Sequence, residues 1–169
     1  PRVRHSAQLW LALLEQLSLV NKSENRFSLL PVTKTFAAAE LQRRAEEARG
    51  YSRRWIDYLI NLSGPRSEED EAGHLLFFWD DAFLLDGPNV LAAIDWAYQY
   101  GQAQDIFALT VIATEYLDVE GRWDLLLRLG RQALELARST NNAKAVARLA
   151  NIMGWFTEQR GDYGQAIEL

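Results

Sequence analysis

The residue types that most often carry out chemistry are sparse in this chain, and the most suggestive of them stand between residues 68 and 81. Glu71 and His74 are three positions apart, the Glu-x-x-His spacing with which a helix presents two metal ligands. A di-metal carboxylate bundle needs two such motifs, and the only other histidine is His5. The pattern therefore favours a solvent-facing histidine over a metal ligand.

Neighbouring carboxylates do not form an acid–base pair. Asp80 and Asp81 are adjacent, so on a helix their side chains would point to different sides. The chain has no cysteine and no Gly-x-x-x-x-Gly-Lys-Ser/Thr phosphate loop, which excludes thiolate catalysis and that type of nucleotide hydrolysis within these residues. We expect no catalytic residue, no metal and no cofactor. A helical hydrolase or metal enzyme remains an alternative that rests on His74 and scattered carboxylates.

Composition limits the possible partners. The formal net charge of −5 disfavours a general nucleic-acid binder. Hydrophobic residues make up 49% of the chain and charged residues 24%, which is typical of a globular protein. No apolar run approaches the roughly 20 residues that cross a bilayer, and residues 1–5 do not form a signal peptide. We expect a cytoplasmic protein without a membrane partner. A start without methionine and an end inside a helical pattern predict a fragment of a longer protein.

The densest basic stretch lies in a helical segment and alternates with Glu40, Glu46 and Glu47. Its members are Arg43, Arg44, Arg49, Arg53 and Arg54. Glu40–Arg44 and Arg43–Glu47 have the i,i+4 spacing of ion pairs on a solvated helix face. The pattern favours such a face, and an anionic partner remains the alternative.

The N-terminal part of the chain predicts a helix, a β-hairpin and a longer helix. After a capping Ser6, apolar residues recur with the helix period at Trp10, Leu13, Leu14 and Leu17. Short apolar segments at 19–20 and 27–30 flank a polar turn at 21–25, the only β-hairpin that the sequence predicts.

Two further helical segments are expected before residue 86. One opens near Pro31, where proline fits the first turn, and continues to Leu62, with Gly50 bending it or dividing it in two. The other begins at the acidic run Ser67-Glu68-Glu69-Asp70 and includes Leu75 to Phe83. Most aromatic side chains of this region and of the next helix are expected in the core: Phe77, Phe78, Trp79, Trp96, Tyr98 and Tyr100.

From residue 89 onward the pattern repeats. Helices are predicted at 89–100, 103–119, 122–139, 142–160 and from 162, with breaks at Gly101, Gly121, Asn141-Asn142 and Gly161. Gly121-Arg122-Trp123 recurs forty positions later as Gly161-Asp162-Tyr163. A single helical hairpin cannot bury its apolar stripe, so such hairpins must stack into a solenoid.

These repeats resemble the tetratricopeptide repeat. Met153-Gly154, Gly161, Tyr163 and Ala166 stand where that family has its Leu-Gly, Gly, aromatic and small residue. In the preceding copy Trp123 and Ala133 fit, whereas Leu126 occupies a normally small position and Gly130 a normally large one. The two departures offset each other in volume, so the helices can still pack closely.

A wider resemblance covers most of the chain. Residues 26–37, RFSLLPVTKTFA, resemble the end of the winged-helix domain in the AP-ATPase/NB-ARC class of signal-transduction NTPases, and 89–97, NVLAAIDWA, resembles the helix that opens the repeat region of its bacterial members. This wider resemblance implies a partial winged-helix-like segment at 1–47, a helical linker at 48–86 and truncated tetratricopeptide-like repeats at 87–169. The family's Met-His-Asp motif falls on Leu29-Leu30-Pro31, and leucine cannot make the histidine's contact with nucleotide phosphate.

The resemblances imply a mainly α fold of antiparallel helical hairpins, stacked as a tetratricopeptide-like solenoid with a small N-terminal winged-helix-like β-hairpin. They also imply ligand contacts from the first helix of each hairpin. Carried over, these are Arg148, Asn151, Trp155, Glu158 and Gln159, and one period earlier Glu115 and Asp118. Trp155 among polar neighbours resembles an interaction hot spot. Packing of Trp155 against a following repeat is the alternative.

The function implied is that of a non-catalytic sensor and protein-interaction segment, in which the repeats bind a partner or the NTPase core. The alternative is a fragment of a DNA-binding transcriptional regulator that uses the winged helix, with 6–17 as its recognition helix. That helix carries Gln8, Glu15 and Gln16 and no Lys or Arg, whereas phosphate contacts need cations. The oligomeric state is left open.

Overall fold

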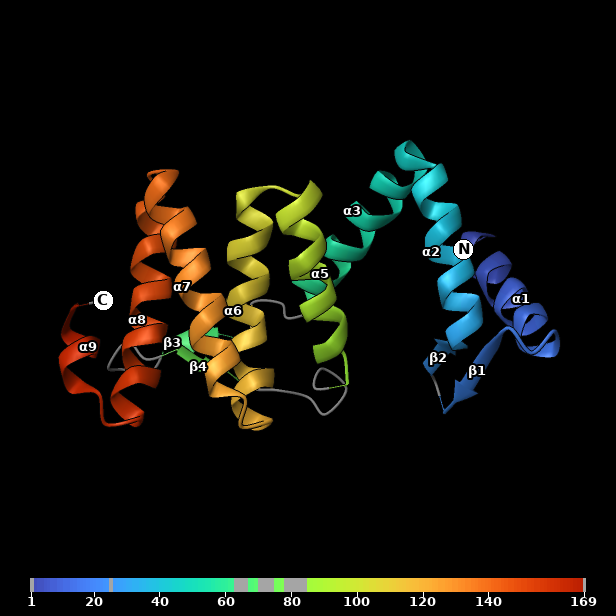
Figure 1. Ribbon diagram of the computed structural model, residues 1–169. Helices are drawn as coiled ribbons and strands as arrows, with labels where there is room; N and C mark the ends of the chain where they lie inside the picture. Colours follow the sequence, from blue (N-terminus) through green and yellow to red (C-terminus); the bar gives the residue numbers. More distant parts are fainter. Residues whose placement is uncertain (1, 25, 63–66, 70–74, 78–84, 169) are drawn as a thin grey trace. The chain divides into compact units, whose positions relative to one another are not determined.

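The computed structural model describes residues 2–24, 26–62, 67–69, 75–77 and 85–168 of the chain (Figure 1). It is mainly helical with a small two-stranded antiparallel sheet near the N-terminus, which confirms the predicted fold class. The chain divides into two compact units, an N-terminal unit of residues 1–52 and a helical unit of residues 53–169. Each is described by itself.

The N-terminal unit contains the predicted hairpin. Helix α1 (Arg2–Gln16) precedes strands β1 (Val20–Ser23) and β2 (Arg26–Leu29), and helix α2 (Pro31–Arg43) follows. The strands pair antiparallel from Val20↔Leu29 to Ser23↔Arg26, so the turn is shorter than the predicted 21–25. Pro31 stands in the first turn of α2, where its missing N–H leaves no bond unmade.

Helix boundaries differ from the prediction in two places. Helix α1 begins at Arg2, ahead of the expected cap at Ser6. The long helix is divided at Arg44 rather than at Gly50, because Arg44 leaves the helical conformation (φ −115°, ψ 56°) while Gly50 lies inside α3 (Ala45–Leu62). A glycine in a helix costs only about 1 kcal/mol and does not by itself end one.

This break also changes the ion pairs of the basic stretch. The expected i,i+4 pairs are wrong. Glu40–Arg44 ends at the break and Arg43–Glu47 spans it, so neither pair lies within one continuous helix. The pairs that form are i,i+3: Arg43–Glu40 at 2.6 Å, Arg44–Glu47 at 3.9 Å and Arg49–Glu46 at 3.1 Å. These side chains are exposed, as a solvated face requires, so each pair contributes little to stability.

The N-terminal unit buries little apolar surface. Among its described side chains Val20 alone is buried. Trp10 and Leu13 fall on one side of α1, as the period predicts, and Leu17 follows the end of the helix, yet all three are exposed. Val32 and Phe36 of α2 are also exposed. These apolar side chains of the unit are not covered.

The helical unit is a stack of antiparallel helices. After the second part of α3 come α5 (Gly87–Tyr100), α6 (Ala103–Val119), α7 (Trp123–Ser139), α8 (Ala143–Gln159) and α9 (Tyr163–Glu168), each within two residues of its predicted start (Figure 1). Each helix packs against the next, and α6 also contacts α8. The arrangement is that of a helical-repeat protein.

The segment before α5 departs from the prediction. Strands β3 (Ser67–Glu69) and β4 (Leu75–Phe77) pair antiparallel, with Ser67↔Phe77 and Glu69↔Leu75 as end pairs, so the helix expected from Ser67 to Phe83 is wrong over these residues. A short continuous apolar run such as Leu75–Phe77 has no period that separates helix from strand. Other residues singled out in this segment lie outside the described ranges: Glu71, His74, Phe78, Trp79, Asp80 and Asp81.

The corners between helices repeat one hydrogen-bond pattern. Gly121 N–H donates to Asp118 O at 2.9 Å and Arg122 N–H to Leu117 O at 2.7 Å. The same two bonds recur around Asn141 and around Gly161. Gly121 and Gly161 have φ of 65° and 82°, the left-handed conformation that ends a helix in this way and that glycine adopts without strain.

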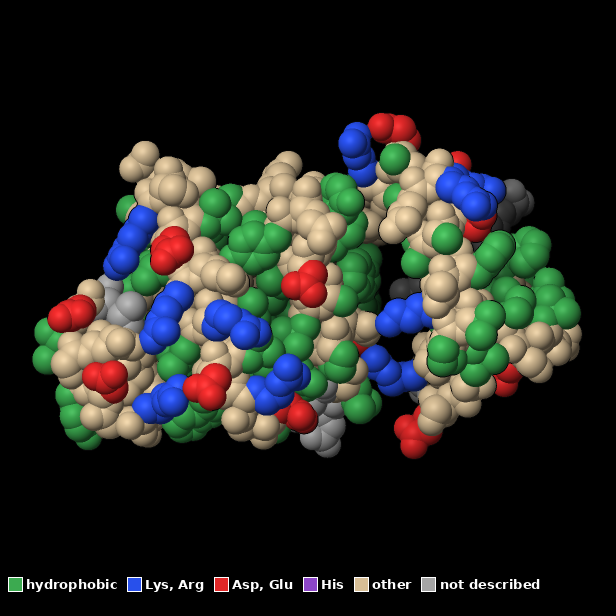
Figure 2. Space-filling model, in the orientation of Figure 1, with side chains coloured by type: hydrophobic (Ala, Val, Ile, Leu, Met, Phe, Trp, Pro, Cys, Tyr) green, Lys and Arg blue, Asp and Glu red, His purple; other side chains and the backbone are tan. Residues whose placement is uncertain are grey.

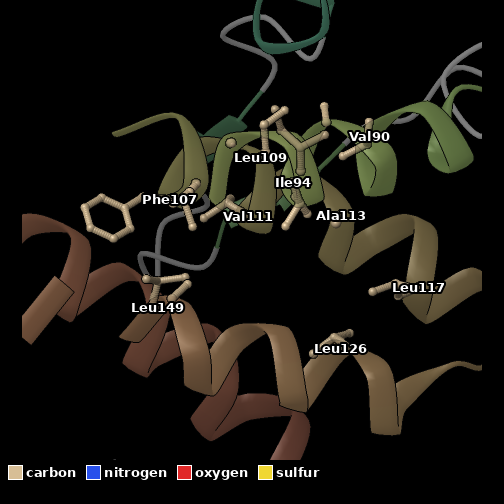
Figure 3. Close-up of a cluster of buried hydrophobic side chains, with 14 of the residues drawn as sticks. Val90, Ile94, Phe107, Leu109, Val111, Ala113, Leu117, Leu126 and Leu149 are labelled. Carbon is tan, nitrogen blue, oxygen red and sulfur yellow. The ribbon is translucent and has the colours of Figure 1, made fainter. Parts of the chain in front are cut away.

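The core of the helical unit runs continuously through the stack (Figure 3). It begins with Ile56 and Leu59 of α3, passes through α5, α6 and α7, and ends at Met153 and Phe156 of α8. Figure 3 shows its middle part, from Val90 of α5 to Leu149 of α8. Helix α6 is buried on nearly every side, as a helix that is apolar all round must be. Leu117 of α6 and Leu126 of α7 belong to this cluster, so the large residue at a normally small repeat position is accommodated.

One ion pair ties α3 to α6. Arg53 donates from Nη1 to both carboxylate oxygens of the buried Asp105, at 2.9 and 2.7 Å. The Asp105 carboxylate also accepts the backbone N–H of Gln102 at 3.2 Å, which caps α6. Arg53 is therefore a tertiary contact and differs from the rest of the basic stretch. Asp105 tolerates burial because its charge is paired and hydrogen-bonded.

Close approaches at two helix glycines predict an order of destabilisation. A Cβ added at Gly87 would lie 2.1 Å from Tyr116 Cδ2, in a ring that cannot bend away, whereas one at Gly130 would lie 2.9 Å from Met153 Cγ and Sδ, which can. We expect Gly87→Ala to lower the free energy of unfolding by about 2–3 kcal/mol and Gly130→Ala by less than about 1 kcal/mol. Denaturant unfolding of each variant measures this.

Gly164→Ala is the matched control, because Gly164 is a helix glycine with only Asp162 Oδ1 near its added Cβ, at 4.0 Å. It should be neutral or stabilise by up to about 1 kcal/mol. Equal losses at Gly87 and Gly130 would contradict the packing described.

Candidate interaction surface

Helix α8 presents most of the predicted groove residues on one exposed face. Arg148, Asn151, Trp155 and Glu158 follow one another at three- and four-residue spacing. Gln159 stands four residues after Trp155, and all five are exposed. The buried residues of α8, including Leu149, Met153 and Phe156, occupy the opposite side. The structure therefore brings these five residues together on one surface.

Trp155 is the largest apolar group on this face. Its side chain is 48% exposed, and its ring meets Phe156 edge-on with centroids 4.6 Å apart. Phe156 is buried, so it supports one edge of the indole while the rest faces solvent. An aromatic ring fixed in this way presents contact area at a low entropic cost, as interaction hot spots do.

The two predicted residues of α6 have different surroundings. Asp118 Oδ1 accepts a hydrogen bond from Trp123 Nε1 at 2.8 Å, and the Trp123 ring lies 6.0 Å from that of Phe156. Asp118 is therefore engaged in holding the α6–α7 corner. The structure does not place it on an open surface together with the α8 residues.

Glu115 is partly buried, and neither of its carboxylate oxygens has a hydrogen-bond partner. Burial raises the pKa of the Glu115 carboxyl to about 9, and the nearby Asp118 carboxylate adds to the shift. At neutral pH the Glu115 carboxyl therefore keeps its proton, so a ligand contact at this position would be made by a neutral carboxyl.

The aromatic residues of α5 do not all join the core. Trp96 is partly buried and packs against it, with the Tyr100 ring 5.5 Å away. Tyr98 and Tyr100 are exposed, so the expectation that they are core residues is wrong. Tyrosine can keep its hydroxyl in water while part of its ring covers neighbouring side chains. A tyrosine near the end of a helix therefore does not by itself predict a buried side chain.

A pocket of about 490 Å³ lies between α7, the end of α8 and α9. Its lining is mostly polar: Asp124, Leu127, Arg131, Thr157, Arg160, Asp162 and Gln165. Arg160 pairs with Asp124 at 2.7 Å, and Arg131 Nη2 donates to Gln165 Oε1 at 2.6 Å. Thr157 is buried, and its hydroxyl has no hydrogen-bond partner.

Sequence reasoning missed this pocket, since none of its residues is among the predicted groove residues. One signal was present. Asp124 follows the first Gly-x-aromatic corner and Arg160 precedes the second, and the forty-residue period makes α7 and α9 equivalent helices of successive hairpins. Charged residues next to repeated corners can meet between such helices.

Positive and negative charges are mixed on the side of the helical unit that Figure 2 shows. Figure 2 shows Lys and Arg side chains interspersed with Asp and Glu over α7 to α9, and neither sign forms a continuous patch on the side in view. An extended nucleic acid would need a continuous basic track.

Protonation of Glu115 predicts a pH dependence of stability. The free carboxyl ionises near 4.5, so between that pH and about 9 the folded chain holds a proton that the unfolded chain has released. The unfolded state then binds fewer protons, and the free energy of unfolding falls as pH rises through this window. Glu115→Gln should remove this fall and stabilise the fold at pH 8. We expect a gain of only about 1–2 kcal/mol, because solvent screens part of the side chain.

Urea unfolding at pH 5, 6.5 and 8 measures this. Glu158→Gln, at an exposed carboxylate of α8, is the control and should keep the wild-type slope. A Glu115→Gln variant with the wild-type pH slope would show that the carboxyl is not held protonated.

The described residues also bear on metal binding and on membrane insertion. Within them, no three His, Cys, Asp or Glu side chains are grouped closely enough to hold a metal ion. Over the same ranges, no helix has both the length and the apolar character needed to span a bilayer. Comparison with protein-family models, curated proteins and solved structures gives no match for this chain.

Proposed function

We propose that this chain is a non-catalytic protein-interaction segment, and that its stacked helices bind a protein partner or the nucleotide-binding core of a signal-transduction NTPase to which the segment belongs. The observation that carries the proposal is the exposed face of α8, where Trp155 stands among Arg148, Asn151 and Gln159. A rigid aromatic surrounded by long polar side chains matches the composition of interface centres.

The N-terminal unit supports the same kind of function. Trp10, Leu17, Val32 and Phe36 are all more than half exposed. Exposed large apolar side chains on a folded protein are candidates for contact with another protein. The proposal therefore gives both units surfaces suited to association.

The NTPase part of the proposal rests on the sequence. Residues 26–37 resemble the end of a winged-helix domain, and a helical linker and repeats follow in the order that the AP-ATPase/NB-ARC class has. In such a protein the repeats would sense a signal and transmit it to the core. The absence of cysteine agrees with a cytoplasmic location, which belongs to the same proposal.

Trp155→Ala tests the proposal. The partner for the titration is the nucleotide-binding core that the proposal places in the same polypeptide, expressed separately. We expect the wild-type chain to bind it and Trp155→Ala to bind at least about 30-fold more weakly, the loss that a hot-spot residue causes. Calorimetric titration measures the affinity, and circular dichroism confirms that the variant is folded.

Tyr58→Ala is the matched control, because Tyr58 is a similarly exposed aromatic on α3 outside the α8 face. It should bind like the wild type. Equal weakening in both variants, or no association with the core, would contradict the proposal. A fluorescence anisotropy titration with duplex DNA at low salt addresses the alternative, and binding there would favour the DNA-binding regulator instead.

A further inference from the structure

We propose that the pocket between α7, α8 and α9 binds a small zwitterion of the α-amino acid class. This site is separate from the α8 face of the proposed protein interaction, because none of the residues that line it belongs to that face. The pocket has the size of small-molecule sites in proteins, which range over roughly 300–1,000 Å³.

Both signs of charge line the same space. Arg131 and Arg160 contribute guanidinium groups, and Asp124 and Asp162 contribute carboxylates. A simple anion would meet the two carboxylates, and a simple cation would meet the two guanidinium groups, so either would be repelled as well as attracted. A ligand with a carboxylate and an ammonium on one carbon matches both, since Arg binds carboxylates in a fork and Asp accepts from ammonium.

The existing contacts leave capacity for a ligand. The Arg160–Asp124 pair is exposed, with the Asp124 side chain 91% exposed, so solvent weakens it and a ligand can replace it. Arg131 uses one donor on Gln165 Oε1, whereas a guanidinium has five. One oxygen of Asp162 accepts the backbone N–H of Gln165 at 3.2 Å, and the carboxylate has a second oxygen.

Thr157 is the second observation that points to a ligand. Its side chain lines the pocket and is 2% exposed, and its hydroxyl has no hydrogen-bond partner. The hydroxyl oxygen itself has almost no accessible surface, so a ligand reaches it only after the Thr157 side chain turns. A buried hydroxyl without a partner destabilises the fold, and such groups are uncommon unless a ligand or water completes them. Leu127 supplies an apolar wall beside it, suited to the side chain of an amino acid.

The test uses the whole chain and a defined set of probes. L-Alanine, L-leucine, L-glutamine and L-lysine are titrated at equal ionic strength beside acetate, inorganic phosphate and ethylammonium. Binding is followed by the melting temperature and by amide chemical shifts. We expect saturable binding of at least one amino acid, with shifts at Thr157 and Gln165, and no binding of the three singly functional ions. No binding of any amino acid, or equal binding of acetate or phosphate, overturns the proposal.

Two variants separate ligand binding from folding. Thr157→Val removes the unpaired hydroxyl, so it should raise the melting temperature by a few degrees while weakening amino acid binding at least tenfold. Arg131→Gln, at an exposed residue, should weaken binding by a similar factor and leave the melting temperature unchanged. Arg128→Gln, an exposed arginine of α7 that does not line the pocket, is the control. Wild-type affinity in both Thr157→Val and Arg131→Gln would overturn the site.

Discussion

Helix α6 has almost no free surface, and the rest of the helical unit depends on that burial. Its side chains from Asp105 to Thr114 and at Tyr116 and Leu117 are buried or nearly so, and it packs against α5, α7 and α8. Since each hairpin of a repeat stack is stabilised chiefly by its neighbours, removing contacts of α6 would weaken both hairpins at once.

The same burial decides where a ligand can bind. A helix enclosed in this way cannot also present a ligand face, so the open surface lies on α8.

Polar groups inside this stack fall into two kinds. Asp105 is paired with Arg53 and caps α6, and the hydroxyl of Thr114 donates to Val111 O at 2.6 Å. These groups regain on folding the hydrogen bonds they had in water. Thr110, Glu115 and Thr157 have no such partner. Glu115 avoids the cost of a buried charge by keeping its proton, whereas a hydroxyl cannot lower its cost of burial in this way. Thr157 differs from Thr110 in lining a pocket. That difference makes Thr157 informative about function.

The repeats could be predicted from the sequence because their signals are local. Gly121 and Gly161 need a left-handed backbone, and the apolar period between them needs only neighbouring residues to be recognised. Predictions failed where long-range packing decides. Leu75–Phe77 fits a strand or a buried helix equally well, and only its pairing with Ser67–Glu69 separates the two. The burial of Glu115 could not be predicted from its repeat position, because nothing near it in the sequence shows that its helix is enclosed. The pocket joins residues as far apart as Asp124 and Gln165, which only the stacked corners bring together.

The N-terminal unit raises a different energetic question, because it has defined elements and almost no core. A two-stranded hairpin such as β1–β2 is at best marginally stable in water, and among the described side chains of this unit only Val20 is buried. Ordering a residue costs about 1–2 kcal/mol of conformational entropy, which burial of one valine cannot offset for a segment of this length. The exposed apolar faces of α1 and α2 are where further burial could come from. Further burial of these side chains would therefore raise the stability of this unit.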